Sequence, residues 1–287
     1  MIIAQNLAPP VSLFPPFRLP QGVAGDAQRL AVLCAGLMLA LMLPTVLAMT
    51  IDGRQLNAIN VWIKPLHFQL ALSVHFATLA ALIPLTGAAD RQGRLLRWSM
   101  LAGVTAGVGE IAYIMTQAAR GRHSHFNVST PLEAALYPIA GVGSVMLVAL
   151  SFIVGVLIWR QRDTRPQSAL RMGAALGLVA GSLATLVIAG AMSSGQIAGP
   201  GHWVGGLRTD AGGLPIVGWS TTGGDLRVPH FFATHMMQAL PLAGLAADWA
   251  APALARRLAL AAALAWAALI AATFVQALAG LPFLPGW

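Results

Sequence analysis

Seven long apolar runs constrain this chain more than any other feature of its sequence. They cover roughly residues 28 to 50, 62 to 86, 96 to 118, 131 to 159, 168 to 192, 229 to 247 and 255 to 279. An apolar helix of about 20 residues crosses the roughly 30 Å hydrocarbon core of a bilayer. The composition, 57% hydrophobic and 9% charged, is typical of a polytopic membrane protein. No run shows the two-residue alternation of a membrane barrel, so we expect an all-α bundle of seven transmembrane helices.

The basic residues predict the orientation of this bundle. Lys and Arg near span ends favour the cytoplasm, and with the N-terminus inside, eleven of the 17 basic residues lie in cytoplasmic segments. We therefore expect a cytoplasmic N-terminus and a periplasmic C-terminus in a bacterial inner (plasma) membrane. The net charge of +8 is then explained by arginines that meet lipid headgroups. Membrane lipids are the expected partners, a homo-oligomer or a larger membrane complex is a further alternative, and no nucleic acid is expected.

The sequence predicts one membrane domain. Residues 1–27 are expected to form an N-terminal tail, because this proline-rich segment lacks the basic start of a cleavable signal. Residues 28–287 are expected to form a single seven-helix domain with a long outer loop over residues 193–228. That loop carries Trp203 and Trp219, so we expect it to fold back over the bundle as a lid, a binding surface or a gate.

Two acidic residues near helix starts have structural explanations. Thr130, Pro131 and Glu133 match a capping box, which makes Glu133 a structural residue. Asp225 precedes the sixth apolar run and is either the cap of that helix or a catalytic carboxylate. Glycines at four-residue spacing, Gly103 with Gly107 and Gly173 with Gly177 and Gly181, predict close helix packing.

All seven histidines fall on the predicted outer side of the membrane. They are His67 and His75 in the second run, His123 and His125 after the third, His202 in the long loop, and His230 and His235 in the sixth run. We expect a histidine-lined site in the outer half of the bundle.

Three ionisable residues are expected to share one layer of that half. A rise of 1.5 Å per residue puts His235 about 9 Å, Glu110 about 12 Å and His75 about 15 Å below the outer ends of their helices. Ionisable groups within the membrane usually face the bundle interior, pair with one another and mark functional sites. Glu110 is therefore a candidate catalytic group, and Gln238, one turn after His235, is expected to face the same cavity.

The histidines suggest two kinds of cofactor. Haem b is held by imidazoles on facing helices, and two pairs are possible. His75 with His235 is one, although their expected depths differ by about 6 Å, and His67 with His230 is a shallower alternative. His230 and Gln238 are further cofactor-binding candidates. A transition metal ion is the alternative, with His125 from the connection after the third run and His230 and His235 from the sixth run as candidate ligands. Cys34 is the only cysteine, and without a Cys-x-x-Cys-His motif covalent haem is excluded.

Parts of the chain resemble a group of uncharacterised bacterial multi-span membrane proteins. The similar stretches are Arg120-Gly121-x-x-Ser124-His125-Phe126-Asn127, Gly218-Trp219-Ser220-Thr221-x-Gly223-Gly224-Asp225-Leu226-Arg227 with the following His230-Phe231 and His235-x-x-Gln238, and Trp62-Ile63-Lys64-Pro65. The resemblance brings no known reaction. It implies that the two outer connections belong to one shared feature.

Four functions are consistent with these residues. The first is a membrane redox protein that binds haem b or a metal ion in the outer half. The second is a proton-coupled transporter or channel in which Glu110 and His235 exchange protons. The third is a metal-dependent intramembrane lipid hydrolase that uses Asp225 or Asp210 as its carboxylate. The fourth is a structural subunit of a larger membrane complex, and whether the chain is an enzyme stays open.

The hydrolase alternative lacks the spacing of a known family. Intramembrane hydrolases related to alkaline ceramidases place a serine four residues before a histidine and end with an H-x-x-x-H pair. Here Ser73 and His75 are two residues apart, and His230 and His235 are five residues apart. Five residues place two side chains about 140° from each other on a helix, so His230 and His235 cannot easily hold one ion together.

Overall fold

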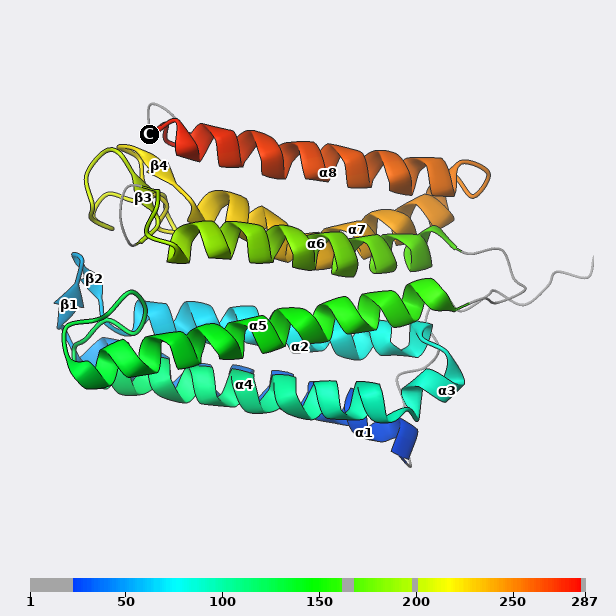
Figure 1. Cartoon of the computed structure of the whole chain (residues 1–287), viewed down its shortest axis with the longest axis horizontal. Coiled ribbons are helices and arrows are strands. Elements are labelled where there is room, and N and C mark those ends of the chain that lie inside the picture. The colour runs from blue at the N-terminus through cyan, green and yellow to red at the C-terminus, as the bar shows by residue number, and fades with distance from the viewer. Residues whose placement is uncertain (1–22, 162–167, 198–200, 285–287) are drawn as a thin grey trace, which may run out of the picture.

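A computed structural model describes residues 23–161, 168–197 and 201–284, with side chains from residue 27 onward. In these ranges seven long helices lie side by side, which confirms the all-α prediction (Figure 1). They are α1 (Val23–Ile51), α2 (Ile63–Leu82), α4 (Arg94–Ala119), α5 (Pro131–Arg160), α6 (Ala169–Ser193), α7 (Arg227–Ala250) and α8 (Ala255–Leu278). The short elements are the 3-10 turn η1 (Ile83–Leu85), helix α3 (Ala88–Arg91), and two antiparallel hairpins, β1 (Gln55–Leu56) with β2 (Ile59–Asn60) and β3 (Trp203–Val204) with β4 (Gly224–Asp225).

The predicted N-terminal tail falls mostly outside the described residues. Residues 1–22 are not described, and α1 already begins at Val23, within the 1–27 segment expected to be a tail. The remaining helix bounds agree with the apolar runs to within a few residues, which is the usual precision for helix ends.

Six helices within the described residues are long and apolar enough to cross a membrane. These are α1, α2 with η1, α4, α5, α6 and α8. The seventh long helix, α7, is not among them because its first half carries polar side chains, among them Arg227, His230 and His235. Helix α7 packs against α6 along its length and also against α8.

The helices form two groups joined through α5 and α6 (Figure 1). Helices α1, α2, α4 and α5 pack against one another, and α6, α7 and α8 form the second group. The main buried core lies between α1, α2, α4, α5 and α6, around Phe76, Met100 and Leu178. A second apolar cluster lies between α6, α7 and α8.

Glycines bring helix backbones together, as the four-residue spacing predicts. A Cβ atom at Gly173, Gly177 or Gly181 of α6 would collide with backbone carbonyl oxygens of α7. At Gly103 and Gly107 of α4 it would press on Leu150 and Phe76, respectively. The close approach of α6 and α7 therefore depends on residues without side chains.

The connections at one end of the bundle are more elaborate than those at the other. The β1–β2 hairpin, the segment 120–130 and the loop 194–226 all lie at the left end of Figure 1. We call this the outer end, after the orientation expected from the sequence, and the opposite end the inner end. A long connection joins α6 to α7 at this end, where the sequence predicts a long loop, and it contains the paired strands β3 and β4.

Candidate functional site

Glu110 of α4 meets a histidine from the following loop. Its Oε1 lies 2.9 Å from Nε2 of His125, and the Glu110 side chain is only 3% exposed. The other ring nitrogen of His125, Nδ1, lies 3.2 Å from Nζ of Lys64 at the start of α2. Phe68, one turn after Lys64, packs beside the imidazole with ring centroids 5.5 Å apart. His125 thus bridges a buried carboxylate and a cation from two different helices.

Backbone hydrogen bonds fix the loop that carries His125. The carbonyl oxygen of His123 accepts hydrogen bonds from Nε2 of Gln117, at 3.1 Å, and from Nδ2 of Asn127, at 2.7 Å. Phe126 adopts a left-handed conformation with φ of 54°. Such a conformation costs about 1 kcal/mol or more for a non-glycine residue and persists only where surrounding contacts impose it. The position of His125 is therefore specified by the fold of the whole loop.

Glu133 is the structural anchor of the same loop, as the capping box predicts. Its carboxylate oxygens accept hydrogen bonds from Arg122, Ser129, Thr130 and Gln117, at 2.7, 2.8, 3.0 and 3.2 Å. The side chain of Thr130 accepts the backbone N–H of Glu133 and caps α5. With these donors in place, Glu133 holds the loop against the helix start and is not available for chemistry.

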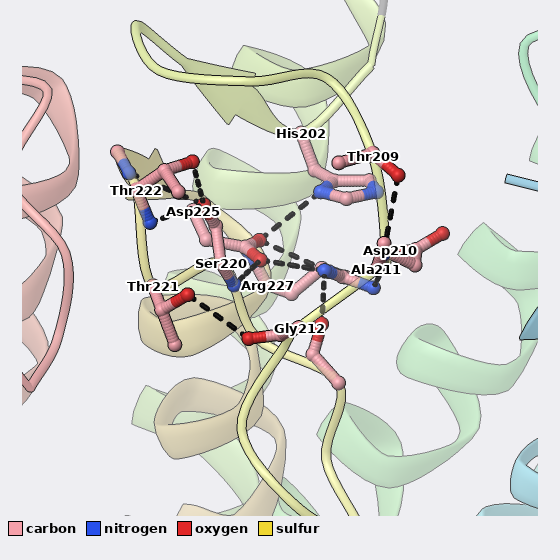
Figure 2. Close-up of polar contacts among 12 residues, drawn as sticks. His202, Thr209, Asp210, Ala211, Gly212, Ser220, Thr221, Thr222, Asp225 and Arg227 are labelled. Atoms are coloured by element: carbon pink, nitrogen blue, oxygen red, sulfur yellow. Dashed lines mark hydrogen bonds and ion pairs between the residues drawn. The ribbon is translucent and has the colours of Figure 1, made fainter. Parts of the chain in front are cut away.

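A second charged cluster surrounds Asp225, which lies within the long connection between α6 and α7 (Figure 2). The carboxylate is fully buried and accepts hydrogen bonds from the Arg227 guanidinium, at 2.6 to 3.0 Å, and from the backbone N–H of Ser220, at 3.0 Å. Nδ1 of His202 lies 3.1 Å from Oδ1. The same oxygen accepts the backbone N–H of Arg227, the first residue of α7. Asp225 thus does serve the start of α7, and these partners support a structural role over a catalytic one.

These partners determine the charge states of Asp225 and His202. Burial alone would raise the pKa of Asp225, but the hydrogen bonds from His202 and Arg227 outweigh it and hold the pKa well below its usual range. Burial lowers the pKa of His202 below 6.5, and the nearby Asp225 carboxylate opposes this only in part. We therefore assign an ionised Asp225 paired with Arg227, and a neutral His202 that donates its Nδ1–H to the carboxylate.

Arg227 ties the long loop to the bundle. Its Nη1 lies 3.0 Å from Oδ1 of Asp210, and its Nη2 donates to the carbonyl oxygen of Gly218 at 2.7 Å. The backbone N–H of Asp210 donates to the carbonyl oxygen of Asn57 in the β1–β2 connection, at 3.2 Å. The loop therefore folds back over the bundle as its apolar residues predict, and it contacts both helix groups.

His75 and His235 lie at one level of neighbouring helices. Nε2 of Gln238 in α7 donates to Oγ1 of Thr78 in α2, at 3.1 Å, and both helices run from the outer to the inner end. His75 and His235 each precede a member of this pair by three residues. The depth difference of about 6 Å expected from helix ends is therefore wrong, because α7 begins deeper, below the long loop.

The polar contacts of these two histidines differ. Nδ1 of His235 lies 3.2 Å from Oε1 of Gln238, and the His235 ring packs against Phe231 with centroids 4.2 Å apart. His75 packs edge-on against Phe76, and its buried Nε2 has no hydrogen-bond partner among the described residues. Buried Nδ1 of His230 likewise has none. Such orphaned polar atoms in a protein interior call for a partner that the chain does not supply.

Glu110, His75 and His235, which were expected to share one layer, lie in two different places. Glu110 contacts His125, whereas His75 and His235 lie at the level of Gln238 and Thr78. Within the described part of the chain, no group of three or more His, Cys, Asp or Glu side chains is arranged to hold a metal ion. The candidate ligands His125, His230 and His235 accordingly form no such group. Both ring nitrogens of His125 already have protein partners.

Lys64 is the functional candidate that the sequence reasoning missed, since it entered there only as a basic residue and as part of the Trp62–Pro65 stretch. It is the sole lysine of the chain, and every other basic residue is an arginine. That contrast, together with its position just inside an apolar run, is the signal that could have drawn attention to it. Lys64 also lies within electrostatic range of Asp210 and Arg227, so it stands between the two charged clusters.

No family model matches this sequence, and no curated protein or solved structure is significantly similar to it. The site must therefore be interpreted from its own geometry.

Proposed function

We propose that this protein crosses the membrane seven times, with its N-terminus in the cytoplasm, and binds a cofactor in the outer half of the bundle. Helix α7 is the seventh span in this proposal. Its polar side chains turn toward other helices, since Gln238 bonds to α2 and Thr234 lies 3.5 Å from Thr185 of α6. Polar residues that face the bundle interior are compatible with a membrane span. The bias of arginines toward the inner end supports the orientation, and a bacterial inner membrane fits it.

The cofactor proposed is haem b, with a transition metal ion as the alternative. The observation that carries this proposal is the placement of His75 and His235 at one level of two parallel helices, with the buried Nε2 of His75 unpartnered. Imidazoles on facing helices are the usual ligands of haem b in helix bundles. Such a group would supply one-electron redox chemistry when bound.

Gln238 has a positioning role in this proposal. It accepts from Nδ1 of His235 and donates to Thr78, so it orients the imidazole and fixes the register of α2 against α7. A hydrogen bond at Nδ1 selects the tautomer whose Nε2 carries the lone pair needed for a ligand. His230, five residues earlier on α7, is a further polar group near His235.

The one-sided distribution of polar residues favours a bound cofactor over transport. Beyond Gln238, α7 carries only apolar residues and glycine from Ala239 to Ala247, and α2 is apolar from Leu79 to Leu82. A transport pathway needs polar groups or water on both sides of its central site. The hydrolase alternative is disfavoured because Asp225, its candidate carboxylate, already receives hydrogen bonds from several donors.

The direct test is spectroscopy of the purified full chain in detergent, oxidised and reduced, with metal analysis on the same sample. We expect a visible haem absorption band, or one metal ion per chain, that is lost in His75→Ala and His235→Ala. His67→Ala is the matched control, because His67 is an exposed histidine of the same helix. Gln238→Ala should weaken binding about 10–100-fold. A featureless spectrum with no stoichiometric metal in the unaltered protein would refute the proposal.

A further inference from the structure

Lys64, His125 and Glu110 make a continuous chain of ionisable groups at the outer end. Nζ of Lys64 lies 3.2 Å from Nδ1 of His125, and Nε2 of the same ring lies 2.9 Å from Oε1 of Glu110. The three side chains come from α2, the loop 120–130 and α4, so tertiary structure alone brings them together. The imidazole thus has one nitrogen near the amine and one near the carboxylate; the second contact lacks hydrogen-bond alignment, so a small turn of the ring precedes proton transfer to Glu110.

We propose that these three residues form a proton-exchange site, in which His125 passes a proton between the Lys64 amine and the Glu110 carboxylate. In the forward direction the Lys64 ammonium gives a proton to Nδ1, and Nε2 gives its own proton to Glu110. The imidazole is neutral before and after, with its tautomer exchanged. The lysine–glutamate ion pair becomes a neutral amine and a neutral carboxylic acid, and no oxidant, reductant or net proton is required.

The protein environment makes both the ion pair and the neutral amine–carboxylic acid pair accessible. Burial in a medium of low dielectric disfavours separated charges, whereas proximity of opposite charges favours them. Burial and the Lys64 cation lower the pKa of the His125 imidazole, and Glu110 opposes this in part. A neutral imidazole is the form that can accept at one nitrogen while donating at the other.

Other charged and titratable groups surround this chain. Asp210 of the long loop and Arg227 of α7 lie within electrostatic range of Lys64, with opposite signs. His123 is also in range of Lys64, and Tyr113 of α4 is in range of both Glu110 and Glu133. Asp210 and Arg227 contact each other, so their effects on Lys64 largely cancel.

The choice of lysine at this position is informative. An arginine would serve as a permanent cation, and the chain uses arginine everywhere else. A guanidinium does not release its proton in proteins, whereas a buried lysine amine readily does. Ser124 supports the ring as well, since its Oγ lies 3.1 Å from Nδ1 of His125. The hydroxyl can bond to either form of that nitrogen, so it holds the imidazole in place while the proton moves.

This inference does not depend on cofactor binding. The ring contact of His75 with Phe76 and the hydrogen bond of His235 with Gln238 involve none of Lys64, His125 and Glu110. A protein without haem or metal would leave the proton-exchange site as argued, and failure of the proton-exchange site would leave the cofactor proposal intact.

The sole lysine permits a specific experiment. The full-length protein is produced with lysine labelled by ¹³C at its ε carbon, and the signal of that carbon is followed against pH. The carbonyl stretch of a protonated carboxylic acid is followed by infrared difference spectroscopy over the same range. Because the exchange takes up no net proton, we expect a neutral Lys64 amine and a Glu110 carboxylic acid band to be present together near neutral pH, in equal amounts. The band should be absent in Glu110→Gln.

Variants separate this site from a simple ion pair. In Glu110→Gln the Lys64 midpoint should move toward lower pH by about one unit or more, because the ammonium loses its counter-charge. Lys64→Arg keeps the cation but cannot release a proton, so it should abolish the Glu110 carboxylic acid band near neutral pH while the chain stays folded. Asp210→Asn is the matched control, since it removes a nearby carboxylate outside the relay and should preserve both the neutral-amine signal and the carboxylic acid band. A carboxylic acid band without a neutral Lys64 amine, an unaltered Lys64 signal in Glu110→Gln, or a persistent band in Lys64→Arg would each overturn the proposal.

Discussion

The outer and inner ends of the bundle use charged residues in different ways. At the inner end, the Asp248 carboxylate accepts the backbone N–H groups of Ala169 and Leu170, both at 2.9 Å, and so caps α6. Arg91 donates to the carbonyl oxygens of Pro84 and Thr86. These inner charges terminate helices. At the outer end, charged side chains contact one another and link segments distant in sequence, such as Lys64 with His125 and Arg227 with Asp210.

The outer carboxylates differ among themselves in a way that separates structure from function. Glu133 and Asp225 each accept several hydrogen bonds from side chains and backbone. Glu110 is about as well buried as these two, but its nearest ionisable neighbour is the imidazole of His125. Burial lowers the pKa of that imidazole. The donors around Glu133 and Asp225 hold segments of the fold together, whereas Glu110 contacts a single titratable ring.

The largest effect is expected from Asp225→Asn. This variant removes the buried carboxylate charge and leaves the partly exposed Arg227 guanidinium with only the Asp210 carboxylate, so the free energy of unfolding should fall by about 3 kcal/mol. Thermal unfolding in detergent measures the loss, and faster protease cleavage within residues 194–226 should accompany it. Unchanged cleavage and an unchanged unfolding temperature would show that Arg227 does not hold the loop.

A smaller effect is expected at the inner end. Asp248→Ala removes the cap of α6 and should lower the free energy of unfolding by about 1 kcal/mol. The Ser168 hydroxyl, which accepts the backbone N–H of Arg171, limits the loss because it also caps this helix. The Lys64 carbon signal should be the same as in the unaltered protein. A change in that signal would mean that the inner-end cap influences the charged residues of the outer end, so that the two ends do not act independently.

The smallest effect is a pH dependence from His202. Its pKa lies below 6.5 in the folded protein because of burial, so the unfolded chain binds the proton first as the pH falls. The stability contributed by His202 is therefore present above about pH 6.5 and is lost below it, by less than about 1 kcal/mol between pH 7 and 5. His202→Gln should flatten this part of the stability curve. An equally steep curve in the variant would assign the titration to another group.

The sequence predicted the parts of the fold that local patterns determine. Apolar runs located the long helices, the Thr130–Glu133 spacing located the cap of α5, and aromatic residues indicated that the long loop folds back. Seven spans and the orientation stay predictions, because α7 is too polar to qualify by composition. Local pattern determines a helix, but only packing determines which face of it meets lipid.

The contacts of the candidate site depended on information that no local pattern carries. The meeting of Glu110 with His125 requires the left-handed turn at Phe126, which no glycine marks. The common level of His75 and His235 depends on where α7 starts below the loop, and the Gln238–Thr78 bond that fixes it joins residues 160 positions apart. Counting residues from predicted helix ends could not give this register.

Helix α7 joins two parts of the molecule that otherwise have little in common. Arg227, the first residue of α7, donates a hydrogen bond to Gly218 in the loop between α6 and α7. Gln238, about 16 Å further along the same helix, donates a hydrogen bond to Thr78 of α2 in the interior. Pro241, where a helix bends most easily, comes after both contacts. Any small sliding or turning of this segment would therefore be transmitted from the interior beside His235 to the loop that connects α6 and α7.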